Sequence, residues 1–326
     1  MSEATPGASA SAEGAASQTA AAIQKAELNV TDLLEAGVHF GHQTRRWNPR
    51  MKPFLYGERN GVHIVDLDQT LPRFREALDF VREVVASGGK VLFVGTKRQA
   101  QAPVQFEAGR SRQFYVNNRW LGGMLTNFKT VKKSIERFNE LLELLADEEK
   151  MAGLSKKVLS GLNRQRVKYG KSLEGIRDMT RLPDAIFVID VSREEIAVSE
   201  ARRLGIPIVA VVDSNCSPDG IDYVIPGNDD STRAIQLYCA RIAEACLEGD
   251  AIHQDRILAE VAEQERARAE AAEQPATPRG RVVVEIPHDA HTGRRSASFG
   301  GRRDDDESPR APAPVVEADK PETPQA

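Results

Sequence analysis

The sequence predicts an α/β fold in which a doubly wound parallel sheet of about five strands carries an inserted antiparallel pair of helices. Two observations lead to this prediction: short apolar runs alternate with helical segments, and one long segment between two of those runs has only helical periodicity. The α/β domain is expected over residues 27–129 and 178–250, and the helical hairpin over residues 130–177.

Five short runs rich in Val, Ile and Phe, each bounded by Gly, Pro, Asp or Asn, are the predicted strands. They lie at residues 91–95, 113–117, 183–190, 206–213 and 222–227. Helical spacing of apolar residues predicts helices over 71–86, 196–204 and 232–246. Nearly continuous apolar strands separated by helices indicate a parallel sheet that is covered on both faces.

The segment 130–177 has the pattern of a helical hairpin. Its first arm repeats apolar residues in steps of four and three, as in a heptad seam, at Val131, Ile135, Phe138, Leu142 and Leu145. The chain is expected to turn near residues 147–153, and a looser apolar spacing follows on a strongly basic return arm. A basic hairpin suits binding to folded RNA, although a solvated pair of surface helices would carry similar charges.

The two ends of the chain have a different composition. Residues 1–26 form a leader rich in Ala, Ser and Gly, and the Pro-rich stretch from about 275 to 326 is equally poor in apolar residues, so both are predicted to be disordered. Between them, residues 251–274 predict a polar, exposed helix. No apolar run is long enough to span a bilayer and no targeting segment is recognised, so a cytoplasmic location without a membrane partner is expected.

Charge is distributed unevenly along the chain. The net charge is −4, but residues 40–135 carry 17 Lys and Arg against 7 Asp and Glu, whereas residues 184–250 carry 5 against 13. This asymmetry predicts that the first half meets phosphate and that the acidic second half faces protein or solvent. Chance clustering of solvated charges is the simpler alternative.

No motif in the sequence predicts a catalytic, metal or cofactor site. The loop at residues 95–101 follows a strand and opens a helix, but it lacks both phosphate-loop fingerprints, so a nucleotide-dependent enzyme is the weaker hypothesis. His39 and His42 are expected to pack or to form hydrogen bonds, and the three cysteines show no metal-binding spacing. The chain is therefore predicted to have no catalytic residue, no metal and no cofactor.

Two patches mix basic and aromatic residues, at 43–61 and 115–130, and Pro49 and Pro53 in the first of them predict an extended loop. Such loops suit phosphate contacts and stacking on unpaired bases, with burial an equal alternative for Trp47 and Trp120. Together with cations of the loop after residue 94 and of the hairpin, they supply the predicted RNA-binding residues: Arg45, Arg46, Trp47, Arg50, Lys52, Lys97, Arg98, Arg119, Lys132, Lys133, Arg164 and Lys168.

Five segments taken in order, 36–67, 92–100, 117–131, 183–195 and 204–235, resemble the bacterial ribosomal protein S2 family. The resemblance covers about residues 28–248, and the chain departs from the family pattern at 151–170 and at Arg193. It implies a flavodoxin-like sheet with a coiled-coil hairpin and a non-enzymatic, ribosome-bound role in translation. It further implies a position between head and body of the small subunit, contacts with ribosomal RNA, and help in docking the large OB-fold mRNA-binding ribosomal protein. A free interaction scaffold built on the hairpin is the remaining alternative.

Overall fold

The computed structural model describes residues 28–147, 151 and 153–273, which belong to one compact unit ending at Glu273. The predicted disordered leader, the predicted disordered tail and most of the predicted hairpin turn lie outside the described residues. Among the described helices, none is long and apolar enough to cross a membrane.

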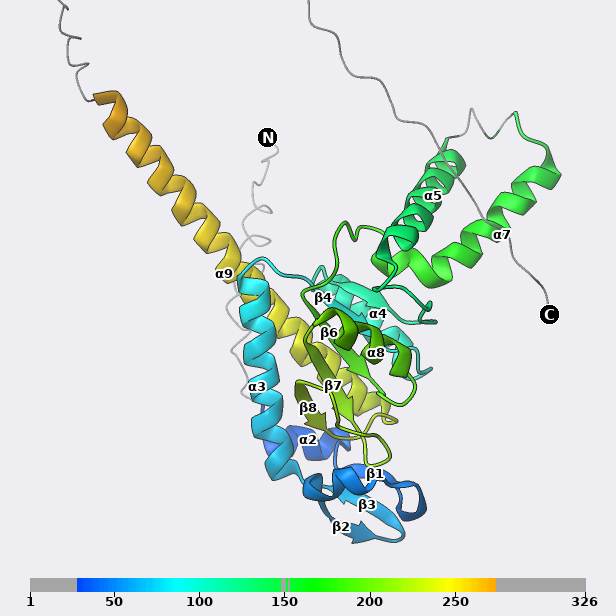
Figure 1. Ribbon diagram of the computed structural model, residues 1–326, viewed down its shortest axis with the longest axis vertical. Coiled ribbons are helices and arrows are strands. Elements are labelled where there is room, and N and C mark those ends of the chain that lie inside the picture. The colour runs from blue at the N-terminus through cyan, green and yellow to red at the C-terminus, as the bar shows by residue number, and fades with distance from the viewer. Residues whose placement is uncertain (1–27, 148–150, 152, 274–326) are drawn as a thin grey trace, which may run out of the picture. The chain divides into compact units, whose positions relative to one another are not determined.

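The centre of the fold is a five-stranded parallel sheet (Figure 1). Its strands are β4 (Val91–Val94), β5 (Phe114–Val116), β6 (Ala185–Ile189), β7 (Ile208–Val212) and β8 (Tyr223–Pro226). They pair in the order β5-β4-β6-β7-β8, which is the flavodoxin-like order. All five predicted strands are confirmed, each one to three residues shorter than its apolar run.

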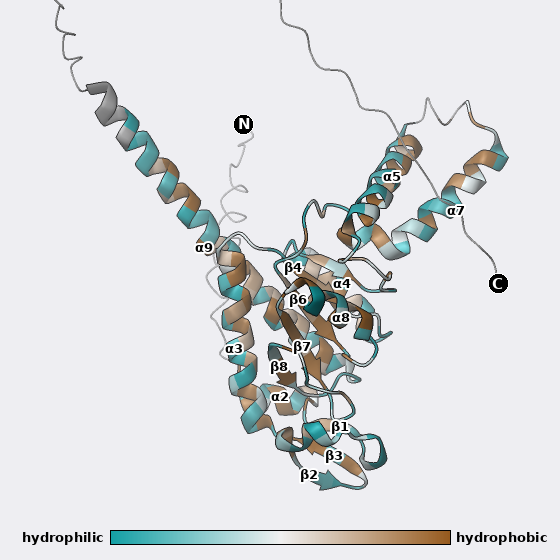
Figure 2. Cartoon of the chain, viewed as in Figure 1, coloured by the Kyte–Doolittle hydropathy of each residue, from teal (hydrophilic) through white to brown (hydrophobic). Residues whose placement is uncertain are grey.

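Alternate residues of each strand face two separate apolar cores. On one face, Phe93 and Phe187 pack under α3 (Leu67–Ala86), α4 (Gln101–Arg110) and α9 (Thr232–Glu273). On the other face, Leu92 and Val188 pack against α8 (Glu195–Leu204) and the inner end of the hairpin. Figure 2 shows β6 and β7 as the most hydrophobic part of the chain, as expected of strands covered on both sides.

The long helix α9 differs from its prediction. Separate helices were expected over 232–246 and 251–274, but the chain continues as one helix from Thr232 to Glu273. Gly249 lies inside this helix at the point where it crosses α3. A Cβ atom there would lie 2.6 Å from the backbone oxygen of Arg82, so the close approach requires glycine. The glycine therefore permits the crossing of two helices and does not end either of them.

The predicted hairpin corresponds to α5 (Phe128–Ala146) and α7 (Lys156–Leu173), followed by the short helix η3 (Glu174–Ile176). The arms meet near the sheet, where the rings of Phe138 and Tyr169 lie 6.2 Å apart. Ile135, Phe138 and Leu141 are buried on α5, whereas only Leu173 is buried on α7. Of the predicted seam, Ile135 and Phe138 are buried, whereas Val131, Leu142 and Leu145 are only half-buried. Coiled-coil packing along the hairpin stays a prediction.

A small antiparallel sheet precedes the main one and was not predicted. Its strands are β1 (Phe40–Gln43), β2 (Leu55–Arg59) and β3 (Val62–Val65), in the order β1-β3-β2, and the helix α2 (Val30–Ala36) comes before them. The prediction of an extended loop between β1 and β2 is wrong. The segment instead forms two 3-10 helices, η1 (Thr44–Arg46) and η2 (Pro49–Phe54). Pro49 is the first residue of η2, a position that tolerates proline, Pro53 lies inside the same short helix, and Met51 of η2 is fully buried.

Candidate nucleic-acid interface

The carboxyl edge of the main sheet gathers loops that lie far apart in the sequence. Because the strands are parallel, the loops that follow β4, β5, β6 and β7 all leave the sheet at this edge. The end of β1 and the η1–η2 segment are each fixed to the same edge by one hydrogen bond. The backbone N–H of Asn48 donates to the carbonyl of Ser214 at 2.7 Å, and that of His42 donates to Ser214 Oγ at 2.7 Å.

The first group of predicted residues lies on η1 and η2. Arg45, Arg46 and Lys52 are exposed and have no described carboxylate partner. Trp47 is 36% exposed, and its ring lies 5.2 Å from that of His63 in a tilted arrangement, so the indole is partly accessible. Arg50 differs from its neighbours because its guanidinium pairs with Asp219.

The remaining cations form two further groups. Arg98 and Arg119 are exposed in the loops after the adjacent strands β4 and β5. Lys132 and Lys133 are exposed on α5, and Arg164 and Lys168 on α7. The structure thus brings the predicted residues onto the carboxyl edge and the hairpin, and not into one continuous patch.

Lys97 has a role other than the predicted phosphate contact. Its ammonium nitrogen lies 2.6 Å from Asp230, 2.8 Å from Asp229 and 3.3 Å from Asp190, and its side chain is largely buried. Although burial opposes the charged form, hydrogen bonds to Asp229 and Asp230 hold the pKa of Lys97 above its usual value. Because these carboxylates already neutralise its charge, Lys97 is not included in the surface proposed below.

The carboxylates around Lys97 form an acidic cluster with His42. The His42 ring lies with Nδ1 3.0 Å from Asp213 and Nε2 3.2 Å from Asp230, and the hydrogen bond to Asp213 raises the pKa of His42. Burial, followed by the charges of Asp213 and Asp190, raises the pKa of Asp229 to about 7.

Two sets of side chains in this cluster have the donor atoms to hold a cation. They are His42 with Asp229 and Asp230, and Asp190 with Cys216 and Asp229; within each set the donor atoms lie within 4.8 Å of one another. The Lys97 ammonium already supplies positive charge to both sets, through Asp229 and Asp230 in the first and through Asp190 and Asp229 in the second. The absence of a metal here stays a prediction.

The loop after β4 uses its polar groups internally. Both the backbone N–H and the hydroxyl of Thr96 donate to Glu194, and Arg193 Nε donates to Thr96 Oγ1 at 2.9 Å. In flavodoxin-like sheets this position, between β4 and β6, is where nucleotides usually bind. Here Glu194 already accepts hydrogen bonds from Thr96, and the surrounding carboxylates neutralise Lys97. The donors that a nucleotide phosphate would need are therefore already in use.

Glu200 of α8 was missed by sequence reasoning, although it organises one of the two basic loops. Its buried carboxylate accepts hydrogen bonds from Trp120 Nε1, from the hydroxyl of Thr126 and from three backbone N–H groups, those of Gly123, Leu125 and Thr126. Trp120 is therefore buried in the fold, which decides between its two interpretations. The only sequence signal was an acidic residue on the apolar face of a predicted helix.

The chain also matches a known protein family. The family model described as ribosomal protein S2 matches residues 33–249. The chain belongs to the ribosomal protein S2 family. That family is structural and not enzymatic, so the prediction that the chain is not an enzyme is confirmed, and the nucleotide-enzyme hypothesis is wrong.

Curated relatives agree with the family model. The chain is 60% identical over 223 residues to the small ribosomal subunit protein uS2 of Jannaschia sp. (strain CCS1), a match that covers 68% of this chain and 80% of the relative. It is 58% identical over 228 residues to the protein of that name from Solidesulfovibrio magneticus, covering 70% and 88%. The relative of that name from Ruegeria pomeroyi is 55% identical over 244 residues, covering 75% and 94%.

Proposed function

We propose that this chain is a structural component of the small ribosomal subunit, binds ribosomal RNA and serves translation. Membership of the ribosomal protein S2 family supports the structural role. The observation that supports RNA binding is that most of the predicted cations are exposed and unpaired among the described residues. Of the eleven Lys and Arg side chains in that set, only Arg50 and Lys97 pair with a carboxylate within the described part of the chain, and the other nine are exposed.

Three arginines on α3, α4 and α9 differ from these cations, because each pairs with a carboxylate. Arg82 pairs with Glu248 at 2.7 Å, Arg110 with Glu107 at 2.6 Å, and Arg241 with Glu244 at 2.9 Å. Their charge is compensated within the fold. Unpaired cations on the carboxyl edge and the hairpin are available for phosphate, the group that dominates binding to nucleic acids.

Further details of the proposal follow the family resemblance. The protein lies between head and body of the small subunit, is ribosome-bound in the cytoplasm, and helps dock the large OB-fold mRNA-binding ribosomal protein. A protein-facing surface is proposed for the acidic residues of 184–250 that lie away from the carboxyl edge, because RNA would be repelled there. Asp190, Asp213, Asp229 and Asp230 are a separate group, because they surround Lys97 and His42 at that edge. The predicted coiled-coil hairpin and the disordered ends belong to the same proposal.

Co-sedimentation tests the proposal most directly. A tagged copy of the full chain, expressed in growing cells, is expected to travel with small subunits through a sucrose gradient at high salt. Recovery of the chain in the soluble fraction would contradict the ribosomal role and would favour a free interaction scaffold.

A further inference from the structure

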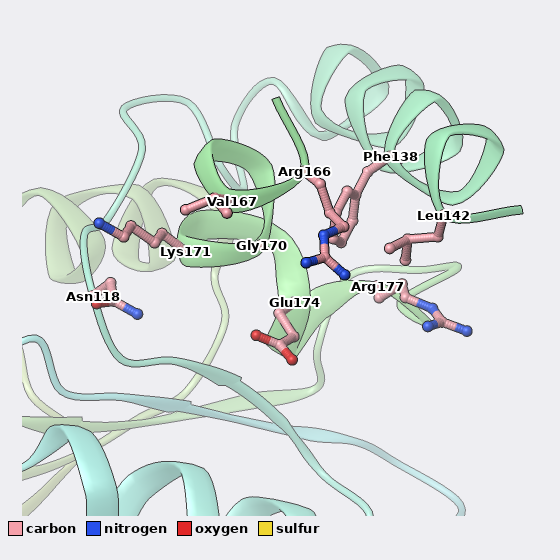
Figure 3. A pocket seen from close by; sticks show the side chains of 9 residues that line it. All are labelled: Asn118, Phe138, Leu142, Arg166, Val167, Gly170, Lys171, Glu174 and Arg177. Carbon is pink, nitrogen blue, oxygen red and sulfur yellow. The ribbon is translucent and has the colours of Figure 1, made fainter. Parts of the chain in front are cut away.

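A cavity of about 410 Å³ lies at the inner end of the hairpin, between α5, α7 and the loop after β5 (Figure 3). Its walls come from both arms of the hairpin and from η3. None of the predicted RNA-binding residues lines it. The cavity is therefore a feature that the interface described above does not explain.

The side chains around this cavity carry a net positive charge. Arg166, Lys171 and Arg177 line it, and Glu174 is its one acidic residue. Arg166 and Lys171 make no ion pair or hydrogen bond with any residue that the structure describes, and Arg177 reaches only the exposed Asp178, at 3.6 Å. Figure 3 shows the Arg166 guanidinium turned toward the Glu174 carboxylate, with the Lys171 ammonium pointing away from both. Three cations against Glu174 and Asp178 leave one net positive charge for an anion.

The cavity lining also includes apolar side chains. Val167 of α7 is 53% exposed, and Phe138 and Leu142 contribute from α5. Gly170 adds no side chain to the lining, and a Cβ atom there would lie in ordinary contact with the ring of Phe138, at 3.8 Å. A larger side chain at this position would therefore extend into the space beside Phe138.

Asn118 adds a polar group that can distinguish ligands. Its side-chain nitrogen donates to Asn117 Oδ1 at 2.9 Å. Its own Oδ1 accepts no hydrogen bond from the described residues, so this oxygen is available to a donor such as the exocyclic amino group of a base.

We infer that this cavity holds one unstacked nucleotide of the ribosomal RNA, an inference that rests on the proposed function. The phosphate lies between Arg166 and Arg177, and the base lies on Val167 beside the Arg166 guanidinium, with Asn118 at its edge. Splayed bases that stack on guanidinium planes and hydrogen-bond through their edges are the usual targets of specific RNA recognition. The volume falls within the roughly 300–1,000 Å³ typical of small-ligand sites. An acidic protein segment would satisfy the charge but offers no planar ring to pack against the apolar residues of the lining.

The test uses small subunits from cells whose only copy of this protein is wild type or a variant. Gly170→Leu fills the cavity and keeps every charge, whereas Arg166→Ala with Arg177→Ala removes the phosphate partners and keeps the space. Lys157→Ala, an exposed cation of α7 outside the cavity, is the matched control. Each particle is probed with dimethyl sulfate and with a carbodiimide, which together reach all four bases.

One nucleotide, or two neighbours, is expected to be protected by the wild type and by Lys157→Ala. The same nucleotide should become as reactive in both cavity variants as in particles lacking the protein, with the rest of the map unchanged. An unchanged map in cavity variants that still co-sediment would overturn the inference and leave the proposed function standing. A change confined to a neighbouring protein would also overturn it. Failure of the wild type itself to co-sediment would instead reject the proposed function. Melting of the purified variants identifies any that fail to fold, and the two cavity variants test the inference independently.

Discussion

Lys97 and Arg98 are adjacent in the chain and have opposite surroundings. Lys97 is enclosed by three carboxylates, and the side chain of one of them, Asp229, is only 1% exposed. Arg98 is exposed and has no described carboxylate partner. The first is therefore a structural cation, and the second is available to an external anion.

Substitutions at these two positions should separate stability from RNA binding. Lys97→Met leaves buried carboxylates without their cation and is expected to lower the unfolding free energy by about 3–5 kcal/mol. Arg98→Ala is expected to change it by less than about 0.5 kcal/mol and to weaken association with small-subunit RNA. Urea unfolding and a binding assay on the same proteins measure both effects. Equal loss of stability in the two variants would contradict this assignment.

Glu200 supports a prediction with a definite pH dependence. Although burial opposes ionisation, hydrogen bonds from Thr126, Trp120 and Gly123 hold the pKa of Glu200 below its unfolded value of 4.5. A lowered carboxyl pKa stabilises the fold above the unfolded pKa, and that stabilisation is lost as the pH falls through the folded pKa. Glu200→Gln should therefore cost about 1.5–3 kcal/mol at pH 7 and less in acid.

Urea unfolding of Glu200→Gln at pH 7 and at pH 3.5 measures this difference. Glu195→Gln, on the exposed side of the same helix, is the matched control and should change stability little at either pH. A cost for Glu200→Gln that does not decrease in acid would show that the carboxylate charge contributes nothing.

At the residue scale, the sequence indicated which segments are basic but not which charged side chains are paired within the fold. Lys97 meets Asp229 across 132 residues, and Glu200 meets Trp120 across 80. Such pairings depend on which loops the sheet order brings together, and residue spacing carries no information on that order. The exposed cations were easier to predict, because they lie in segments with too few apolar residues to be buried.

At the element scale, the five main strands were predictable because each lies in an apolar run, and β4, β6 and β7 are fully buried. The small antiparallel sheet was missed because β1 and β2 contain few apolar residues and β2 is largely exposed. Tyr56 of β2 is 81% exposed, so no burial pattern could indicate a strand there.

The outer half of α9 allows an element-scale prediction. Gly249 packs on α3, and Arg256 donates to the carbonyl of Ala86 at 3.3 Å, but Ile257, Leu258 and Val261 are exposed. A chain that ends at Leu258 should unfold within about 0.5 kcal/mol of the full chain. A chain that ends at Leu247 keeps the Phe74–Tyr238 contact but loses the contacts that Gly249 and Arg256 make with α3, and should be less stable by about 1–2 kcal/mol. Thermal and urea unfolding of the three proteins decide this, and a clear loss in the longer truncation would contradict it.

For the whole molecule, the distribution of charge matters more than its sum. A net charge of −4 would argue against RNA binding if it were spread evenly. Pairing within the fold removes part of the positive charge on one face, as at Arg110 and Arg241, and leaves it uncompensated on η1, the carboxyl edge and the hairpin. The uncompensated cations alone should release counterions from RNA.

Salt dependence distinguishes these two kinds of arginine. Replacing Arg45 and Arg46 by Ala removes two exposed charges, and the slope of log K against log salt for binding to small-subunit RNA should fall by about 2, one for each lost phosphate contact. Replacing Arg110 and Arg241 by Ala removes the same formal charge from ion-paired positions and should leave the slope unchanged. Filter binding of the full chain at several salt concentrations measures both. If the two double variants shifted the slope equally, overall charge and not the placement of the unpaired cations would govern RNA binding.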